Sequence, residues 1–195
     1  MKVGDLTVPY AMSPDQTIHI ERPSIDDGVE CWRLASESKV LDVNSKYAYL
    51  LWCRDFAETS TVARLGRRVL GFITGYRRPE EPRTLLVWQV AVHSDARGQG
   101  LAGRMLDALF DQVDGVDHLE TTITPDNTAS IALFRAFAKR RGARVRTDEL
   151  FGADLLGGDH EPEHKYRIGP ISPDGDGVGP SERAGPRANV LPERT

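Results

Sequence analysis

The sequence predicts an α/β domain in which helices flank a mixed central sheet. Segments with the two-residue alternation of strands are interspersed along the chain with segments of helical periodicity. The most apolar segment, Leu85–Val92, has the composition of a central strand buried on both faces. A glycine-rich loop separates this segment from an amphipathic helix. We therefore expect the element order β-α-α-β-β-β-α-β-α-β-β.

The first elements are a strand and two helices. Thr17–Glu21 alternates between polar and apolar residues and predicts a strand. Ser24 with Asp27 three residues later resembles a capping box. It predicts a helix with apolar residues at helical spacing, namely Ile25, Val29 and Trp32. Asn44 is expected to cap a second helix, whose apolar residues are Tyr47, Leu50, Leu51 and Phe56.

A hairpin and the central strand follow. Thr61–Arg64 and Val69–Tyr76 alternate like strands, and Gly66 lies in the predicted turn between them. The apolar segment Leu85–Val92 is then expected to lie in the middle of the sheet, since neither of its faces carries a charged residue.

The second half of the chain alternates helices and strands. Gln99–Val113 carries one apolar stripe and stops before Gly115, which favours a helix end. Thr128–Arg141 predicts another helix, which ends in cations followed by a glycine. The remaining strands are expected at His118–Ile123, Ala143–Arg146 and Lys165–Ile168.

Three parts are expected within the 195 residues. Residues 1–16 predict a flexible leader, 17–168 the folded domain and 169–195 a disordered tail. The last segment contains five Gly and five Pro and almost no apolar periodicity. Such a segment buries too little apolar surface to offset the entropy lost on ordering.

The composition argues against several classes of protein. A net charge of −4 gives no electrostatic reason to expect nucleic acid as a partner, and no apolar run has the length of a membrane span. The first sixteen residues lack the apolar core of a secretory signal, so we expect a cytoplasmic protein. Cys31 and Cys53 are too few for a disulfide framework, and no Cys/His spacing suggests zinc. We expect two buried thiols and no metal.

The glycine-rich loop is the main functional signal. It reads Arg97-Gly98-Gln99-Gly100-Leu101-Ala102-Gly103 and opens the helix that follows the central strand. Glycines let a ligand approach the backbone, and the exposed N–H groups at a helix N-terminus favour an anion such as a phosphate. The alternative is that these glycines serve only a tight turn.

The same loop also matches the dinucleotide pattern GxGxxG from Gly98 to Gly103. Glu120 lies 20 residues after Gly100, where that pattern places its ribose-binding acid. The context argues against this interpretation. His93–Arg97 separates the strand from the glycines, and four strands and two helices are predicted before the motif.

Arg97-x-x-Gly100-x-Ala102 resembles the Q/R-x-x-G-x-G/A signature of the GCN5-related N-acetyltransferases, whose fold has the element order predicted above. The resemblance implies that acetyl-CoA is the cosubstrate and that the loop holds its pyrophosphate. It also implies a bulged strand that opens a slot for pantetheine, with one backbone N–H stabilising the oxyanion. The residues implied in the strand and loop are Val90, Ala91, Val92, Arg97, Gly98, Gln99, Gly100, Leu101 and Ala102.

A second motif of the family follows. Asn127, Ser130 and Leu133 match the N-x-x-A/S-x-x-L pattern, whose members contact pantetheine. Many relatives place a tyrosine seven residues after the asparagine, where it protonates the departing thiolate. This chain has Phe134 there, so another group or water must donate the proton, and Phe134 is expected to be core or a pantetheine wall. The 3′-phosphate candidates are Arg104, Lys139 and Arg140.

Further blocks resemble the family members that acetylate the 4-amino group of L-2,4-diaminobutyrate, a step toward the compatible solute ectoine. They are Val40–Ser45, Tyr47–Trp52, Val87–Val92 and Thr124–Asn127. The resemblance covers about residues 18–168 and implies a small diamino-acid substrate. It also implies a homodimer, and exposed aromatic residues between Tyr47 and Phe56 would suit such an interface. The alternatives are another amine, such as a polyamine or a protein terminus, and a catalytically silent acyl-CoA-binding protein.

The expected substrate residues are Asp42, Tyr47, Trp88 and Gln89. Asp42 suits an ammonium partner or a solvated acid at a helix start, and Trp88 suits a pocket wall or the core. By strand alternation Trp88 and Gln89 should face opposite ways. Glu163 or His164, in an acidic loop before the last strand, is expected to be the general base, and Glu120 is a weaker candidate. No residue is marked as a covalent nucleophile.

Overall fold

The computed structural model describes residues 17–38, 41–157 and 161–172, in which a seven-stranded mixed sheet has the order β1-β2-β3-β4-β5-β7-β6. The predicted leader, 1–16, and the part of the predicted tail at 173–195 lie outside the described residues. The strands are β1 (Ile18–Glu21), β2 (Thr61–Leu65), β3 (Arg68–Arg77), β4 (Thr84–Val92), β5 (His118–Ile123), β6 (Val145–Phe151) and β7 (Glu163–Ile168). The helices are α1 (Gly28–Ser38), α2 (Lys46–Asp55), α3 (Leu101–Gln112) and α4 (Thr128–Arg140). The predicted element order is confirmed.

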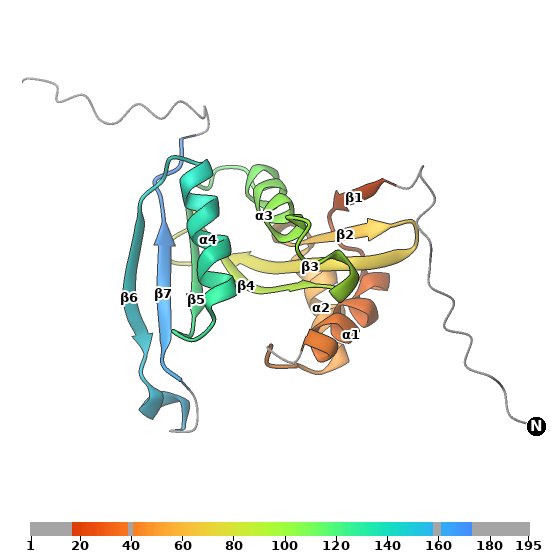
Figure 1. Ribbon diagram of the computed structural model, residues 1–195, viewed down its shortest axis with the longest axis horizontal. Helices are drawn as coiled ribbons and strands as arrows, with labels where there is room; N and C mark the ends of the chain where they lie inside the picture. The colour runs from red at the N-terminus through yellow and green to blue at the C-terminus, as the bar shows by residue number, and fades with distance from the viewer. Residues whose placement is uncertain (1–16, 39–40, 158–160, 173–195) are drawn as a thin grey trace, which may run out of the picture.

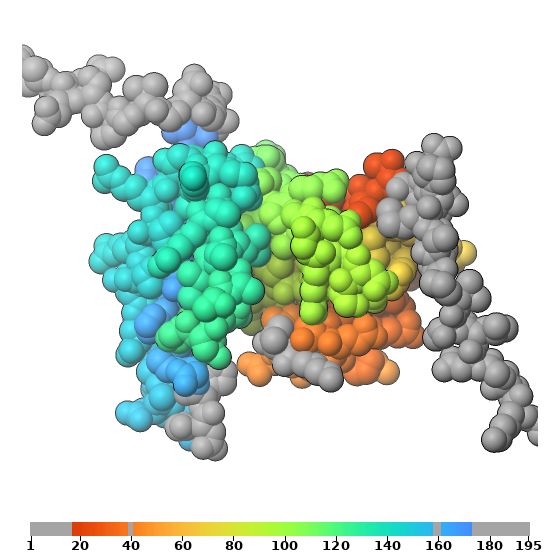
Figure 2. Space-filling model, viewed as in Figure 1, coloured from red at the N-terminus to blue at the C-terminus, as the bar shows by residue number. Residues whose placement is uncertain are grey.

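The helices form a layer on each face of the sheet. On one face α1 and α2 pack around Phe72, and both cysteines, Cys31 and Cys53, are buried there as free thiols. On the other face α3 and α4 pack around Leu109 and Phe137 in the larger core. Figure 2 shows α3 and α4 (green and teal) beside each other on that face. The amphipathic stripes read from the sequence therefore point into two separate cores.

The sheet opens between β4 and β5. These strands are parallel and pair only over Thr84–Leu86, opposite His118–Glu120. Beyond Leu86 the two strands diverge, and Figure 1 shows β5, β6 and β7 running at a steep angle to β3 and β4. The gap lies at the carboxyl ends of two neighbouring parallel strands, where open α/β sheets commonly bind their ligands.

A β-bulge in β4 lies at the start of this gap. Gly75 of β3 is opposite Val87, whereas Thr74 is opposite Gln89, so that Trp88 is the extra residue. A bulge adds one residue to a strand, bends it and interrupts its alternation. The bulge expected from the family resemblance is therefore present, but it falls at Trp88 rather than at Val90–Val92.

Several predicted boundaries were wrong. The second helix is capped by Ser45, whose hydroxyl accepts a hydrogen bond from the Ala48 N–H, rather than by Asn44. The third begins at Leu101 rather than Gln99, because the preceding glycine has a left-handed conformation. The strand predicted at 143–146 runs from 145 to 151, and the last strand begins at 163. Because the central strand exposes Trp88 by 41%, it is not buried on both faces throughout.

The folded unit extends past residue 168. Ile171 is 4% exposed and belongs to the larger core, and its N–H donates to the Asp117 carbonyl. The Gly169 N–H donates to the Arg144 carbonyl. The first residues of the predicted tail therefore complete the domain, because a single isoleucine can be buried without the periodicity that marks an element.

Asp27 links the first helix to the sheet. Burial alone would raise the pKa of this carboxyl, but hydrogen bonds from Arg64 and Ser24 outweigh it and lower the pKa. One oxygen accepts from Arg64 Nη2 at 2.7 Å and from the Ser24 N–H at 2.7 Å. The capping box expected from Ser24 therefore forms, on a short 3₁₀ turn that precedes α1.

This ion pair predicts a pH-dependent stability. The pKa of the Asp27 carboxyl is lower in the folded protein than in the unfolded chain, where it is about 3.9. The ion pair with Arg64 therefore stabilises the fold fully at pH values above this unfolded pKa. It is lost as the pH falls through the folded value. We expect Asp27→Asn to destabilise the protein by about 3 kcal/mol at neutral pH and to reduce the loss of stability below about pH 4. Urea midpoints measured against pH test this. Asp148→Asn, which affects an exposed pair with Arg146, should change stability by less than about 0.5 kcal/mol.

Candidate active site

Two cavities adjoin the gap between β4 and β5. The first, here called the glycine-loop cleft, has a volume of about 530 Å³ and lies between the loop and α4. The second, here called the acidic cavity, has a volume of about 440 Å³ and lies at the open end of β5. Val92 and Leu133 line the first and Val90 and Phe134 line the second, so the cavities lie along neighbouring residues of one strand and one helix.

The backbone of the loop suits a phosphate. Gly98 and Gly100 have φ angles of 75° and 69°, and beyond the adjacent residues of the chain no protein atom lies within 4 Å of where a Cβ would stand at either position. Both glycines line the glycine-loop cleft together with Leu101 and Ala102 at the N-terminus of α3. Left-handed glycines followed by a helix N-terminus direct N–H groups toward an anion. Gln99, also predicted, does not line this cleft and its amide donates to the Asp95 carbonyl.

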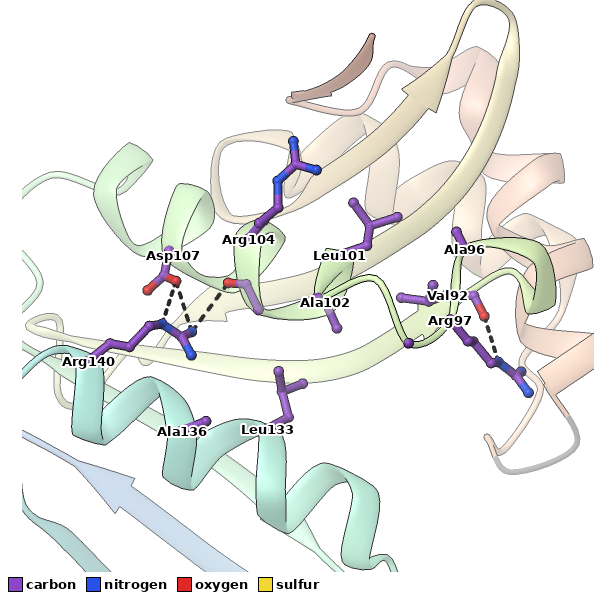
Figure 3. Close-up of a pocket in the computed structure, with 13 residues that line it drawn as sticks. Val92, Ala96, Arg97, Leu101, Ala102, Arg104, Asp107, Leu133, Ala136 and Arg140 are labelled. Atoms are coloured by element: carbon purple, nitrogen blue, oxygen red, sulfur yellow. Dashed lines mark hydrogen bonds and ion pairs between the residues drawn. The ribbon is translucent and has the colours of Figure 1, made fainter. Parts of the chain in front are cut away.

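Three arginines give the cleft its positive charge. Arg97 donates through Nε to the Val92 carbonyl at 3.1 Å, which ties the loop to the end of β4. Arg140 is held by Asp107 at 2.8 Å, whereas Arg104 points away from this pair (Figure 3). Three residues were expected as partners of the 3′-phosphate. Arg104 and Arg140 line the cleft, and Lys139 does not.

The peptides of β4 alternate toward β3 and toward the gap. The His93 N–H donates to the Leu70 carbonyl of β3, so two-residue alternation also directs the Ala91 peptide toward β3. The peptides of Val90 and Val92 then face the gap. Of the three strand residues predicted to meet the cosubstrate, Ala91 therefore has its backbone engaged in the sheet, and its buried side chain faces α1 and α2.

The second family motif lies where the two cavities approach each other. Asn127 caps α4 by accepting the Ser130 N–H at 3.1 Å. Asn127, Ser130 and Phe134 all line the acidic cavity. Phe134 is 2% exposed and also belongs to the larger core, so it serves as both core and cavity wall.

The acidic cavity is lined by four carboxylates: Asp42, Asp126, Glu161 and Glu163. Glu163 Oε2 is buried and has no hydrogen-bond partner within the described residues. Asp126 accepts from the Thr124 hydroxyl at 2.6 Å. A buried carboxylate oxygen without a partner is costly, so a ligand carrying N–H donors would be stabilised there.

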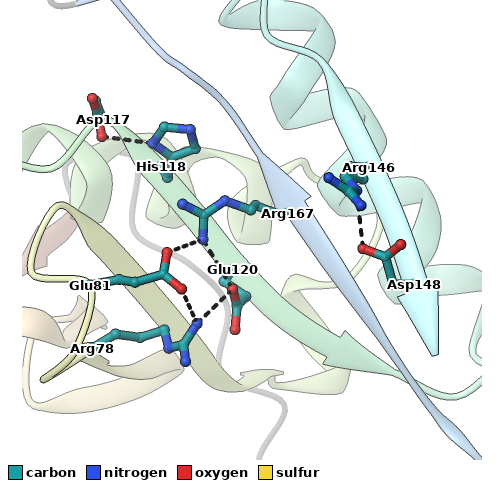
Figure 4. A network of polar contacts seen from close by, with 8 residues as sticks. All are labelled: Arg78, Glu81, Asp117, His118, Glu120, Arg146, Asp148 and Arg167. Atoms are coloured by element: carbon teal, nitrogen blue, oxygen red, sulfur yellow. Dashed lines mark hydrogen bonds and ion pairs between the residues drawn. The ribbon is translucent and has the colours of Figure 1, made fainter. Parts of the chain in front are cut away.

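Neither of the other predicted bases lies in this cavity. His164 follows Glu163 on β7 and therefore faces the opposite side of the sheet, opposite Ile123 of β5. Glu120 is 3% exposed and accepts from Arg78 at 3.3 Å and from Arg167 at 3.4 Å (Figure 4). Glu120 thus belongs to an ion-pair network. Of the three candidates for a general base, the structure brings only Glu163 to the cavity.

The bulge changes the predicted orientation of Trp88 and Gln89. Both face α2: the Trp88 ring lies 4.5 Å from that of Trp52, and Gln89 Oε1 accepts from the Tyr49 hydroxyl at 3.0 Å. The prediction that they face opposite ways was wrong, because the extra residue interrupts the alternation. Both residues line the acidic cavity, whereas Tyr47 is 68% exposed and does not.

Gln89 is 4% exposed and uses its amide within the protein. Its Nε2 donates to the backbone carbonyl of Asp42 at 2.9 Å, and Asn44 lies beside Tyr49. Burial raises the pKa of the Tyr49 hydroxyl, which stays neutral at physiological pH. These contacts fasten the segment from Asp42 to Asn44 onto the sheet and fix it as a wall of the acidic cavity.

The sequence interpretation missed several residues that line the cavities. They are Leu41, Asn44, Thr121, Thr122, Ile123, Thr124 and Asp126 in the acidic cavity and Ala96, Asp107 and Ala136 in the glycine-loop cleft. A signal was available for the group from Thr121 to Asp126, because polar residues at the carboxyl end of a strand beside a sheet opening often line a site. Asp107 gave no signal, since it reads as a polar position of an amphipathic helix.

Metal centres and membrane spans are both absent from the described residues. In residues 17–38, 41–157 and 161–172 no three His, Cys, Asp or Glu side chains are grouped to hold a metal ion. No helix in the described part of the chain is long and apolar enough to cross a membrane.

Comparison with known proteins gives a consistent result. Residues 27–138 match the family model of the acetyltransferase (GNAT) family. The chain is 56% identical over 163 residues to an L-2,4-diaminobutyric acid acetyltransferase of Streptomyces coelicolor, covering 81% of this chain and 96% of that one. It is 44% identical over 175 residues to that of Halomonas elongata, covering 88% and 90%.

Among solved structures, the fold is similar to that of diaminobutyrate acetyltransferase EctA from Paenibacillus lautus in complex with its substrate L-2,4-diaminobutyric acid and coenzyme A. The TM-score is 0.77 and the identity 36%, and the similarity covers 84% of this chain and 99% of that one. The chain therefore shares the fold of an acetyltransferase whose solved structure holds both a diamino acid and coenzyme A.

Proposed function

This chain belongs to the acetyltransferase (GNAT) family, and we propose that it transfers the acetyl group of acetyl-CoA to the 4-amino group of L-2,4-diaminobutyrate, giving the N4-acetyl product used for ectoine. The observation that carries the proposal is the carboxylate-lined cavity beside the glycine-loop cleft. An anionic cosubstrate and a cationic amine would thus meet at the gap between β4 and β5.

The glycine-loop cleft would bind acetyl-CoA. The N–H groups around Gly98 and Gly100 would hold the pyrophosphate, with Arg97 beside them. The pantetheine arm would then lie in the gap, with the thioester carbonyl near the Val90 and Val92 peptides. An N–H group already fixed at that place stabilises the oxyanion at no cost of reorganisation.

The amine would come from the acidic cavity. An alkylammonium has a reference pKa near ~10, so one proton must leave before the nitrogen can attack. We propose Glu163 as the base, since its Oε2 is buried and unpartnered within the described residues. The neutral nitrogen attacks the carbonyl carbon directly and the C–N bond forms; the nitrogen then loses its second proton, and the C–S bond breaks to release the thiolate.

The thiolate must be protonated without a tyrosine. Phe134 stands at the usual tyrosine position and carries no hydroxyl, so a water molecule or the Ser130 hydroxyl in the same cavity would deliver the proton. A catalytically silent acyl-CoA-binding protein remains the second candidate because of this phenylalanine. Any thiol release that requires an amine rejects that candidate.

A thiol-release assay with mapping of the acetylated nitrogen tests the main proposal. We expect release with diaminobutyrate and acetylation at N4, and much lower kcat/KM with ornithine and lysine, whose longer side chains would displace the amine. Equal kcat/KM values for the three amino acids would contradict the specific assignment and leave a general amine acetyltransferase.

Gln89 is proposed as a positioning residue for the Asp42 segment. We expect Gln89→Leu to raise KM for diaminobutyrate about tenfold, because a net loss of about 1–1.5 kcal/mol per hydrogen bond frees that segment. KM for acetyl-CoA should stay within about twofold, because the glycine-loop cleft does not include Gln89. Steady-state kinetics in both substrates measure the two values.

Tyr49→Phe is the matched variant, because it removes only the hydroxyl that donates to Gln89. It should move KM for diaminobutyrate in the same direction by a smaller factor. A change of both KM values by the same factor would indicate general destabilisation and would contradict a positioning role.

We also propose a cytoplasmic homodimer. Tyr47, Trp88 and Phe56 expose 68%, 41% and 38% of their surface, which is much aromatic surface for a monomer to leave in water. Light scattering that gives a mass near 21.6 kDa would contradict the dimer. Cell fractionation tests the location.

A further inference from the structure

Four charged side chains form a closed ring of ion pairs, here called the ion-pair ring (Figure 4). Arg78 Nη1 lies 2.9 Å from Glu81 Oε1 and 3.3 Å from Glu120 Oε2. Arg167 Nη1 lies 2.6 Å from Glu81 Oε2 and 3.4 Å from the same Glu120 oxygen. Each arginine therefore pairs with both acids, and the four charges balance. Glu120, which is 3% exposed, is a buried carboxylate that the two arginines stabilise.

The ring joins two halves of the sheet. Arg78 follows β3 directly and Glu81 lies between β3 and β4, whereas Glu120 lies on β5 and Arg167 on β7. Glu120 stands opposite Leu86 at the last position where β4 and β5 pair, and beyond it the two strands diverge. The ring therefore fixes the half formed by β1 to β4 against the half formed by β5, β6 and β7, at the start of the gap.

The ring lies on the opposite face of the sheet from α3 and α4. Leu119 and Ile168 belong to the larger core under those helices, so their neighbours Glu120 and Arg167 face the other way. On that other face, the described core under α1 and α2 contains residues of β2, β3 and β4 and none of β5, β6 or β7. Ion pairs join α3 to the C-terminal end of α4 on one face, and the ion-pair ring joins the end of β3 to β5 and β7 on the other.

Each half supplies one side of the candidate site. Val90 of β4 lines the acidic cavity, and so do residues 121–123 of β5 and Glu163 of β7. The proposed base thus stands on one half, and the Val90 peptide, near which we expect the thioester, stands on the other. The angle between the halves therefore sets the distance between the amine and the carbon that it attacks. A misplacement of about 1 Å can lower the rate by about 10²-fold.

We propose that Glu120 is a positioning residue for acetyl transfer: it holds the ion-pair ring closed, and the ring sets the angle between the halves that brings Glu163 to the thioester. This inference rests on the proposed function. Glu120 lines neither cavity, so it acts through Arg78 and Arg167 and not on the reacting atoms. Without its charge the two guanidinium groups share only Glu81, and their repulsion would open the junction of β4 and β5.

Glu120→Gln in the full-length enzyme tests this role. We expect kcat with diaminobutyrate to fall about 10²-fold, since the amide has the size of the carboxylate but not its charge. KM for acetyl-CoA should stay within about threefold, because ion pairs of α3 with α4 hold the walls of the glycine-loop cleft together. A fall of kcat by less than about tenfold overturns the inference.

Glu81→Gln removes the other acid of the ring from a more accessible place, since the Glu81 side chain is 41% exposed. This variant should fold, and its kcat should fall about tenfold. An unchanged kcat in Glu81→Gln overturns the inference, also where Glu120→Gln fails to fold.

Two variants outside the ring separate positioning from general stability. Arg83→Gln removes the exposed ion pair with Asp117 at the same junction and should keep kcat within about twofold. Asp27→Asn breaks the buried ion pair with Arg64, and should lower stability but not kcat at a temperature where the variant is folded. If Asp27→Asn lowered kcat as much as Glu120→Gln, the loss would follow from general destabilisation and the inference would be wrong.

A distance measurement tests the ring without any turnover. Spin labels can be attached through Arg67→Cys in the β2–β3 turn and Glu149→Cys on β6, since both positions are exposed. Cys31 and Cys53 are buried, which protects them from the label. Pulsed electron paramagnetic resonance between the two labels then reports how the halves of the sheet are placed.

We expect the distribution of label distances to broaden or shift in Glu120→Gln and to stay unchanged in Arg83→Gln. An unchanged distribution in Glu120→Gln overturns the inference, whether or not diaminobutyrate is the substrate. No turnover of diaminobutyrate by the unmodified enzyme would instead reject the proposed function, so the two failures are distinguishable.

Discussion

Replacing Glu163 by glutamine is expected to lower kcat/KM for diaminobutyrate by about 10²–10⁴-fold, the usual contribution of a general base. Glutamine keeps the size of the side chain but can neither accept the proton of the amine nor pair with its charge. The effect should fall mainly on kcat, because the neutralised amine is required for the chemical step. Glu163 Oε2 is buried without a partner within the described residues, so the folded protein should tolerate the amide.

Two neighbours on the same sheet provide the controls. Glu149→Gln makes the same change on exposed strand β6, where it should leave kcat/KM unchanged. His164→Asn alters the next residue of β7, which faces the other side of the sheet, and should change kcat/KM by less than about threefold. If E163Q retained wild-type kcat/KM across the pH range while H164N lost activity, the assignment of the base would be wrong.

Much of the fold could be predicted because it depends on local patterns. The apolar run Leu85–Val92 contains no turn residue and forms the strand on which both cavities depend. The stripe of the helix that begins at Leu101 is part of the larger core. Gly66 supplies the predicted turn with a φ of 60°. In each case sequence neighbours decide the conformation, so the pattern carries the information.

The errors arise where the conformation depends on distant residues. The bulge at Trp88 follows from the pairing of β4 with Gly75 and Thr74 of β3, and alternation within β4 does not reveal it. Likewise, local patterns put Glu163 and His164 in a loop, whereas pairing with β5 and β6 extends the last strand to include them. This extension separates the two side chains onto opposite faces, which no local property of the pair indicates.

The candidate site could be predicted in part for the same reason. Motif residues such as Gly100 and Asn127 are set by short spacings, and they line the cavities. Tyr47 is expected on the first turn of the second helix, as a donor to the substrate carboxylate or a packing residue, but the register of α2 places it in solvent and Tyr49 in the core. A shift of two residues rotates a helical side chain by more than half a turn, so the helix cap at Ser45 decides which tyrosine is buried.

Replacing Gly100 by alanine is expected to raise KM for acetyl-CoA about 10–100-fold. Gly100 has a φ of 69°, where an alanine costs about 1–2 kcal/mol, and relief of this strain would turn the loop N–H groups away from the pyrophosphate. The added Cβ would also project into open space within the glycine-loop cleft, where the phosphates should approach the backbone. KM for diaminobutyrate should change little, since Gly100 does not line the acidic cavity.

Gly66→Ala separates the effect on binding from the effect of strain. Gly66 has a φ of 60°, and no protein atom lies within 4 Å of where its Cβ would stand, but it belongs to the β2–β3 turn and lines neither cavity. Both variants should lose about 1–2 kcal/mol of stability, measured by urea unfolding, and only Gly100→Ala should weaken acetyl-CoA binding. Equal KM values for acetyl-CoA in the two variants would mean that the glycine serves only the turn. A selective rise would show that the left-handed backbone at Gly100 is required because the cosubstrate lies against it.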